Sequence, residues 1–362
     1  MGKASVPITV MVTGVGGGGH GEQILKALRM AKTPYKIVGG DMSPYSIGLL
    51  HVDYPYLLPP AKDPRYIDVL LKLCRKHDVK ALFHGSEFEL KTMSTHRDRI
   101  RDTGIFLPIN PAHVITLCMD KVCTAETLVE KGFKVPPFRR VATVEDAESF
   151  PYLPAVLKPS LGGGGSVNIY IVQDREALGF FARQLLAIYN DFIIQAYVGT
   201  PEHEYTVGVL IDMEGSLLNS IAVRRYIMSS LGSLIKVPNR TERNELGPML
   251  GISSGISQGA IGRFPEVTEA CERLALSLGA RGAINIQCRL VDGNPCIFEI
   301  NPRFSGTTSL RAMVGYNEPD ILIRRHVLGE EIKPHFPYKE GVIVRGLVER
   351  LIEDFRFPNA LD

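Results

Sequence analysis

Short apolar runs alternate with amphipathic helical segments in the first third of the chain. Residues 8–13 form a β-branched run that ends in a glycine-rich stretch, and a helical pattern follows it. Two further short strands are expected at 35–38 and 81–83, with an amphipathic helix at 65–77 between them. Strands that alternate with helices and short loops predict a doubly wound parallel sheet over about the first 110 residues.

The pattern changes in the second part of the chain, where strands follow one another through tight turns. The turns Met213-Glu214-Gly215-Ser216 and Asp292-Gly293-Asn294 each separate two apolar runs and predict hairpins. The expected strands are 155–159, 168–172, 192–195, 204–212, 217–226, 283–290 and 296–300, and the expected helices are 120–131, 174–189 and 265–278. The fold class is therefore α/β, with an α+β, largely antiparallel second half.

Composition narrows the class of protein. The 362 residues suggest two or three domains, and the 45% hydrophobic content is ordinary for a globular protein. A formal net charge of +2, without a basic stripe, argues against a nucleic-acid partner. No apolar run is long enough to predict a membrane span, and the N-terminus does not resemble a secretory signal. Six cysteines without a Cys-x-x-Cys motif predict buried, reduced thiols and a cytoplasmic location.

The first glycine run, Gly16 to Gly19, stands between a strand and a helix. Consecutive backbone amides at a helix start can hold an anion, so Gly18 and the adjacent His20 are candidate substrate contacts. The spacing of the glycines, with Asp41 further on, also permits a dinucleotide site. A third interpretation is that the glycines serve only the packing of helix against strand.

The second glycine run follows Lys158 and stands between two expected strands. Its residues are Gly162, Gly163, Gly164, Gly165 and Ser166. A hairpin tip of this kind can fold over a polyphosphate, with its amides as donors and Lys158 beside it. It is not a Walker A loop, because no Gly-Lys-Ser/Thr opens a helix here.

A third cluster joins a polar residue of one expected strand to the end of the next. Glu299 and Asn301 are two residues apart and share a face, and Gln287 lies on the neighbouring strand of the hairpin. Three oxygen donors on one face suit Mg²⁺, and Arg303 on the same face could grip an anion. Taken alone, a Glu-x-Asn pair is more typical of a solvated strand end.

The order and spacing of these features resemble the ATP-grasp superfamily, in particular the modules of carbamoyl-phosphate synthase large subunits and biotin carboxylases. The resemblance covers roughly residues 8–330, and the matching segments are 119–121, 154–159, 194–198, 204–207, Gln287 and 298–303. It implies a Rossmann-like domain over 1–112, a small lid subdomain over 113–195, and a large subdomain over 196–362 that carries the metal site. It also implies ATP and Mg²⁺, or Mn²⁺, as cofactors.

The resemblance assigns a role to each matching residue. Lys121 and Lys158 would contact the ATP phosphates under the loop 162–166. The other implied roles are adenine recognition by Gln195 and the backbone around Ala196, Tyr197 and Val198, ribose binding by Glu204, and Mg²⁺ binding by Gln287, Glu299 and Asn301. Relatives often carry a carboxylate where this chain has Gln287, so a second metal would be held more weakly.

Candidates for the substrate are Arg224 and Arg225, which end a strand that should face the cleft. Lys236 follows in a flexible segment, and Glu87 could receive a substrate ammonium. Together with Lys158, residues Arg225, Lys236 and Arg303 are the candidate catalytic cations.

The expected function is ATP-dependent joining of a small carboxylate, such as an amino acid, to an amine through an acyl phosphate, with release of ADP and phosphate. The alternatives are phosphorylation of bicarbonate or carbamate, an NAD-dependent dehydrogenase built on the first glycine run, and an ATP-binding protein without turnover. The partners would be small molecules, and a homodimer is implied only by the family.

Overall fold

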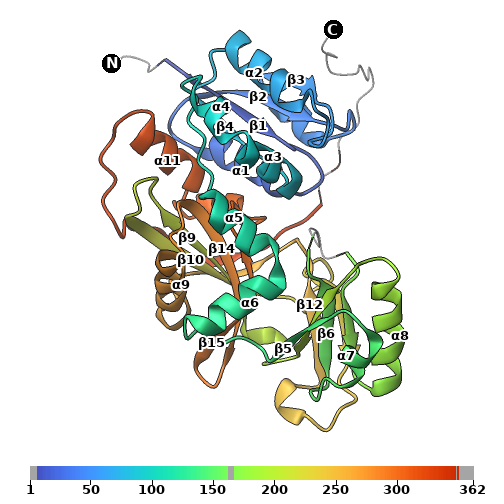
Figure 1. Cartoon of the computed structure of the whole chain (residues 1–362). Helices are drawn as coiled ribbons and strands as arrows, with labels where there is room; N and C mark the ends of the chain where they lie inside the picture. The colour runs from blue at the N-terminus through green and yellow to red at the C-terminus, as the bar shows by residue number, and fades with distance from the viewer. Residues whose placement is uncertain (1–5, 162–166, 348, 350–362) are drawn as a thin grey trace.

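The computed structural model describes residues 6–161, 167–347 and 349 (Figure 1). The chain begins with a four-stranded parallel sheet in the order β3-β2-β1-β4. Its elements are β1 (Ile8–Thr13), α1 (His20–Met30), β2 (Tyr35–Asp41), η1 (Ile47–His51), β3 (Tyr54–Leu57), α2 (Tyr66–Lys76), β4 (Ala81–Phe83), α3 (Glu87–Thr95) and α4 (Arg97–Arg101).

Alternate residues of β1 pack on opposite faces of this sheet. Val10 and Val12 belong to the cluster that contains Ile24 of α1, whereas Met11 belongs to the cluster that contains Leu70 of α2. A parallel strand that is buried on both faces needs apolar residues at successive positions, and Val10, Met11 and Val12 supply them. The predicted doubly wound parallel sheet is confirmed.

A six-stranded antiparallel sheet forms the centre of the molecule, in the order β15-β14-β9-β10-β13-β16. Valine and isoleucine side chains at odd positions of β9, such as Val207, pack against Leu274 of α9, so even positions such as Glu204 face the other side. The elements are α5 (Ala112–Met119), α6 (Lys121–Glu130), η2 (Pro201–His203), β9 (Glu204–Ile211), β10 (Leu217–Arg225), β13 (Gly259–Gly262), α9 (Pro265–Ser277), β14 (Gly282–Val291), β15 (Asn294–Asn301), α10 (Thr308–Met313), α11 (Glu318–His326) and β16 (Gly341–Ile343).

A smaller four-stranded sheet, in the order β5-β8-β6-β7, lies beside the central one (Figure 1). Its own core includes Leu157, Leu178 and Phe192. A two-stranded ladder of β11 and β12 packs on it through Leu250, which shares a cluster with Val156. The elements are β5 (Phe138–Val141), α7 (Val144–Glu148), β6 (Ala155–Pro159), β7 (Tyr170–Val172), α8 (Arg175–Leu186), β8 (Phe192–Ala196), β11 (Ser233–Pro238), η3 (Asn244–Leu246) and β12 (Met249–Ser253).

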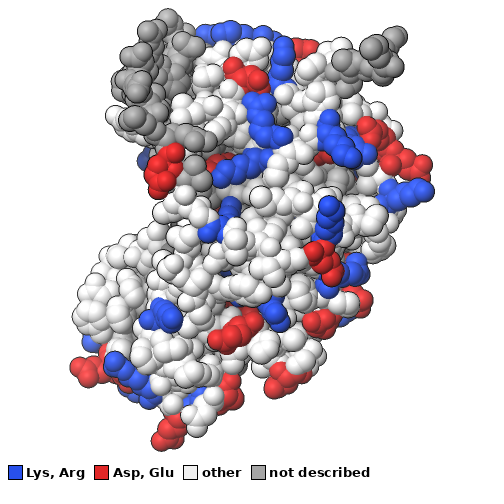
Figure 2. Space-filling model, turned by 180° about the vertical axis from the view of Figure 1, so that it is seen from behind, with Lys and Arg blue, Asp and Glu red and all other residues white. Residues whose placement is uncertain are grey.

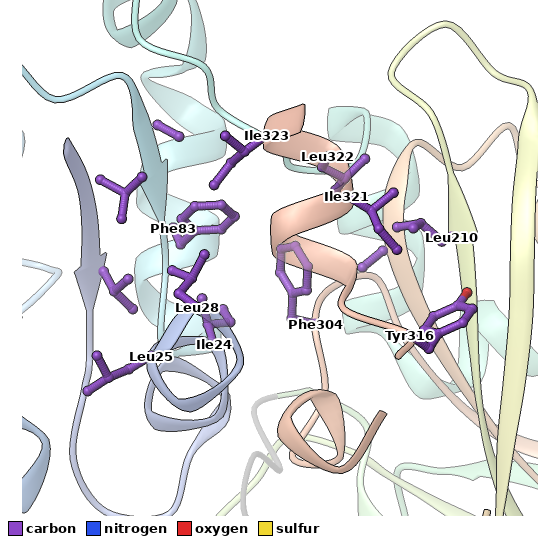
Figure 3. Close-up of a cluster of buried hydrophobic side chains, with 14 of the residues drawn as sticks. Ile24, Leu25, Leu28, Phe83, Leu210, Phe304, Tyr316, Ile321, Leu322 and Ile323 are labelled. Carbon is purple, nitrogen blue, oxygen red and sulfur yellow. The ribbon is translucent and has the colours of Figure 1, made fainter. Parts of the chain in front are cut away.

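One hydrophobic cluster ties the first sheet to the central one (Figure 3). Phe83 at the end of β4 meets Phe304 edge to face, with ring centroids 5.7 Å apart, and Leu322 of α11 belongs to the same cluster. Buried apolar contacts of this kind fix the relative position of the two sheets. The carboxyl ends of β1 and β4 are therefore held near the end of β15.

The structure contains several elements that the sequence analysis did not predict, and three of them bear on the domain organisation. Residues 112–119 form a separate helix, α5, the segment around Lys236 forms the β11–β12 ladder, and Gly341–Ile343 pairs with β13 as an edge strand. Among the described residues, no helix combines the length and apolar character that crossing a membrane requires. All six cysteines lie in the described part of the chain and are free thiols.

Candidate active site

A cavity lies where β6, β8 and β12 face the inner positions of the central sheet. Most of the sequence-predicted site residues line it, although their segments are far apart in the chain. These residues are Glu87, Lys121, Lys158, Gln195, Ala196, Tyr197, Val198, Glu204, Arg225, Gln287, Glu299, Asn301 and Arg303. The fold therefore brings the separate motifs together in one place.

Two lysines stand on adjoining segments of the cavity wall. Lys158 of β6 is buried and its Nζ donates to the Phe298 carbonyl at 3.1 Å. The pKa of Lys158 is lowered to about 8, mainly by burial; Glu299 opposes this shift, and the nearby Lys121 adds to it. The Lys121 amide donates to the Ser160 carbonyl, which ties α6 to the end of β6. The predicted loop 162–166 lies outside the described residues.

The segment after β8 carries the predicted adenine contacts. Gln195 is buried and faces the cavity. The Ala196 amide donates to the Pro137 carbonyl at 2.8 Å, and the Tyr197 amide donates to the Pro154 carbonyl at 2.9 Å. These two amides hold the segment in place, so a ligand would have to be recognised by other groups of the segment.

Glu204, the expected ribose contact, is held by two arginines. Arg225 Nη1 lies 3.3 Å from one carboxylate oxygen, and Arg289 Nη2 lies 2.9 Å from the other. All three side chains are buried, and a buried carboxylate requires such partners. Arg289 was missed in the sequence. Its position two residues after Gln287, on the same strand, was the signal, since residues two apart on a strand share a face.

The predicted metal ligands form a continuous hydrogen-bonded chain with two arginines. The Glu299 carboxylate accepts hydrogen bonds from the side-chain Nε2 of Gln287 at 3.3 Å and from the side-chain Nδ2 of Asn301 at 3.4 Å. The Gln287 side-chain oxygen accepts from Arg225 Nη1 at 3.0 Å, and the Asn301 side-chain oxygen accepts from Arg303 Nη2 at 3.0 Å. Each amide thus connects the central carboxylate to an arginine.

This donor set suits one hard divalent cation that is shared with a phosphate. Glu299 is the sole carboxylate of the three residues, and no group of three or more His, Cys, Asp or Glu residues that could hold a metal occurs in the described part of the chain. Mg²⁺ commonly takes only one or two protein carboxylates and completes its shell with water and phosphate oxygens. Glu299 meets that requirement.

The first domain contributes Glu87 and a pair of histidines near this site. Glu87 Oε1 lies 2.8 Å from Arg303 Nη2. Burial alone would raise the pKa of the Glu87 carboxyl, but Arg303 and Lys121 lower it more, so the net change is downward. His20 and His84, both buried, lie 3.1 Å apart through ring nitrogens, and burial lowers the pKa of both. Glu87 is thus paired with Arg303 and lines the cavity, and its expected contact with a substrate ammonium stays a prediction.

Two backbone N–H groups of the first glycine run donate hydrogen bonds to carboxylates of the protein itself. The Gly16 amide donates to Asp41 at 2.9 Å, and the Gly18 amide donates to Glu22 at 2.8 Å. At Gly21, a Cβ would lie 2.3 Å from the Gly14 carbonyl, so the helix approaches the strand too closely for any other residue. These contacts favour the packing interpretation, and both carboxylate oxygens of Asp41 already accept backbone N–H bonds, from Gly16 and Ser43.

Four predicted substrate or catalytic residues do not line the cavity. Arg224 pairs across the strands with Tyr205, on the α9 face of the sheet, because neighbouring residues of a strand point to opposite faces. Lys236 is exposed on β11, Gly18 is exposed in its loop, and His20 is buried against His84. Of the two adjacent arginines, the fold therefore selects Arg225.

Acidic and basic side chains are interspersed on the face that Figure 2 shows. The cavity, in contrast, has an excess of cations: five Lys or Arg residues and three Glu residues line its described part. A net positive cavity in a nearly neutral protein suits a polyanionic ligand.

Two segments of the chain match models of known protein families. Residues 253–349 match the family model described as "ATP-grasp in the biosynthetic pathway with Ter operon", and residues 12–108 match "PylC-like, N-terminal domain". The chain is 24% identical over 286 residues to the carbamoyl phosphate synthase large chain of Thermoplasma volcanium. The match covers 72% of this chain and 26% of that protein, so the chain spans about a quarter of the relative's length.

Solved structures share the fold over nearly the whole chain. The L-amino acid ligase of Bacillus licheniformis has a TM-score of 0.61 at 18% identity, and the match covers 92% of this chain and 78% of that one. The biotin carboxylase domain of the 2-oxoglutarate carboxylase of Hydrogenobacter thermophilus, solved as a dimer with MgADP, ADP and bicarbonate, also gives 0.61 at 18% identity, covering 92% and 72%. In its family match over residues 253–349 and in its fold, the chain is therefore similar to ATP-grasp proteins.

Proposed function

We propose that the chain is an ATP-dependent ligase that activates a small carboxylate as an acyl phosphate and transfers it to an amine, with release of ADP and phosphate. The observation that carries the proposal is the convergence of Lys121, Lys158, Arg225 and Arg303 on one cavity around Glu299. Phosphoryl transfer depends largely on positioning and on cations that neutralise phosphate charge, and this arrangement supplies both.

Each cation has a distinct place in the proposed reaction. Lys158 and Lys121 would bind nucleotide phosphates, and Arg303 would orient the attacking carboxylate. A bound Mg²⁺ would neutralise phosphate charge, held by Glu299 and the nucleotide. Glu87 fixes Arg303 through their ion pair, so the first domain helps to position the substrate.

The superfamily supports ATP and Mg²⁺ as cofactors, and the solved relatives named above support an amino acid or another small carboxylate as substrate. The proposed organisation is a first domain over 1–112, a small subdomain over 113–195 and a large subdomain over 196–362. The ladder of β11 and β12 belongs with the small sheet in packing, although it lies in the third range.

A second candidate function is the phosphorylation of bicarbonate. It is favoured by the similarity to carbamoyl phosphate synthase and by the bicarbonate in the Hydrogenobacter thermophilus structure. ATPase activity that depends on bicarbonate, with no amino acid present, would identify it. A dehydrogenase is disfavoured, because Asp41 is bonded to the Gly16 and Ser43 amides.

The test is a screen of carboxylates and amines with ATP and Mg²⁺, in which phosphate release and the nucleotide product are both measured. We expect ADP and phosphate to appear only when a carboxylate and an amine that suit the site are present. The appearance of AMP and pyrophosphate would exclude an acyl phosphate. The variant Glu299→Ala should abolish turnover, and full turnover in that variant would show that the cavity is not the active site.

A further inference from the structure

Arg225 connects the two sides of the cavity, and this position has a consequence for metal binding. Its Nη1 lies 3.3 Å from Glu204 and 3.0 Å from the side-chain oxygen of Gln287, and its Nη2 donates to the Ser254 carbonyl. The guanidinium is thus fixed on three sides. It also donates a hydrogen bond to the oxygen of Gln287 that a metal ion would need at this position.

Among the three predicted metal ligands, Gln287 is the one whose side-chain oxygen accepts a hydrogen bond from Arg225. A magnesium ion on the same oxygen would have to approach to about 2.1 Å. The guanidinium already lies 3.0 Å from that oxygen. Because Gln287 is neutral, it offers no negative charge to offset the repulsion between the two cations.

The charges of the cavity also favour a single metal. In the described part of the wall, Glu87 is paired with Arg303, and Glu204 lies between Arg225 and Arg289, so Glu299 is the carboxylate without an ion pair there. Five cationic and three acidic side chains leave two positive charges in excess. These match the roughly two negative charges that ATP retains after it binds one divalent ion, since ATP carries about four.

One donor of Arg225 remains available to a ligand. The side chain is only 4% exposed, and its buried Nε has no hydrogen-bond partner among the described residues. A buried guanidinium N–H without a partner is costly unless a ligand satisfies it. The residue lines the cavity, where a phosphate oxygen could accept this bond.

We propose that Arg225 takes the place of a second divalent cation: it holds the Gln287 oxygen and donates its free Nε–H to a nucleotide phosphate, so the nucleotide binds with one metal ion. The inference rests on the proposed function, because it requires the cavity to bind a nucleoside triphosphate. It makes Arg225 a residue of the nucleotide site, whereas Arg224 on the opposite face of the strand is not.

The test counts the metal ions that accompany a bound nucleotide. The full chain is saturated with Mn²⁺ and adenosine 5′-(β,γ-imido)triphosphate, freed of excess ligand on a desalting column, and assayed for bound manganese and nucleotide. One manganese for each bound nucleotide supports the inference. Two would overturn it and leave the proposed function intact, whereas the absence of bound nucleotide would overturn the proposed function and the inference with it.

Variants separate Arg225 from its neighbour. Arg225→Met should weaken binding of the analogue by about tenfold or more, the effect of losing a charge-assisted hydrogen bond. Arg224→Met removes the same charge from the same strand and should change binding less than about twofold. Equal effects of the two variants would overturn the proposed role.

A second pair of variants tests the exchange of arginine for metal. Gln287→Glu alone should still bind one manganese, because the new carboxylate pairs with Arg225. Gln287→Glu combined with Arg225→Met should bind two, because it supplies a carboxylate and removes the competing cation. Two ions in the single variant, or one in the double variant with native circular dichroism, would contradict the inference.

Discussion

Lys158 offers a test that separates binding from stability. The side chain is buried, and its pKa falls from 10.5 to about 8. Such a change corresponds to about 3 kcal/mol of preference against the charged lysine in the folded state. Replacement by methionine removes this cost and also removes the hydrogen bond to the Phe298 carbonyl, which contributes about 1 kcal/mol. Lys158→Met should therefore stabilise the protein by about 2 kcal/mol at pH 7.

The sign of this effect depends on pH. Below pH 8 lysine is charged in both the folded and the unfolded states, so the full cost is present. As the pH rises through about 8 the folded state releases its proton first, and the stability of the wild type rises relative to the variant. Near pH 10.5 the cost has largely gone and only the lost hydrogen bond remains. The variant should then be about 1 kcal/mol less stable than the wild type.

The measurement is urea denaturation followed by far-UV circular dichroism, since the chain contains no tryptophan. Lys236→Met, the same change at an exposed lysine, is the control and should alter stability by less than about 0.5 kcal/mol. ATP affinity should fall at least about tenfold in Lys158→Met only. A Lys158→Met variant that is less stable than the wild type at pH 7 would refute the reasoning, because Lys158 would then be a structural cation.

Other changes test the contacts around the site. Arg311 is 1% exposed and pairs with the fully buried Glu318 at 2.9 Å. The variant Arg311→Met should lower the free energy of unfolding by about 3–5 kcal/mol, because it leaves the Glu318 carboxylate without a cation. A loss below about 1 kcal/mol in urea denaturation would contradict this. Glu87→Gln should reduce the turnover number about tenfold through misplacement of Arg303, with a stability loss of about 1 kcal/mol or less. Unchanged phosphate release would count against a role for the first domain in positioning.

Local patterns were sufficient for much of the fold. The alternation of strands and helices predicted the parallel sheet, and the turns before residues 217 and 294 predicted two hairpins that the structure contains. The two-residue spacing placed Glu299 and Asn301 on one face, where both now border the cavity. These properties depend on neighbours in the chain, so the sequence carries them directly.

Contacts between distant segments could not be predicted in this way. Which of Arg224 and Arg225 faces the cavity depends on the register of β10 against β9, which no local pattern specifies. The pairing of Glu204 with Arg289 follows from the register of β14 against β9. The backbone N–H groups of Gly16 and Gly18 donate to the carboxylates of Asp41 and Glu22, and the spacing of the glycines does not predict these partners.

The proposed acyl phosphate can be tested most directly by following oxygen. The carboxylate that the screen identifies is labelled with ¹⁸O and incubated with ATP, Mg²⁺ and the amine, and the released phosphate is examined by mass spectrometry. Attack of the carboxylate on the γ-phosphate transfers one labelled oxygen to the phosphate when the amine displaces it, so singly labelled phosphate is expected. Unlabelled phosphate, or label that appears in AMP, would contradict the proposed reaction.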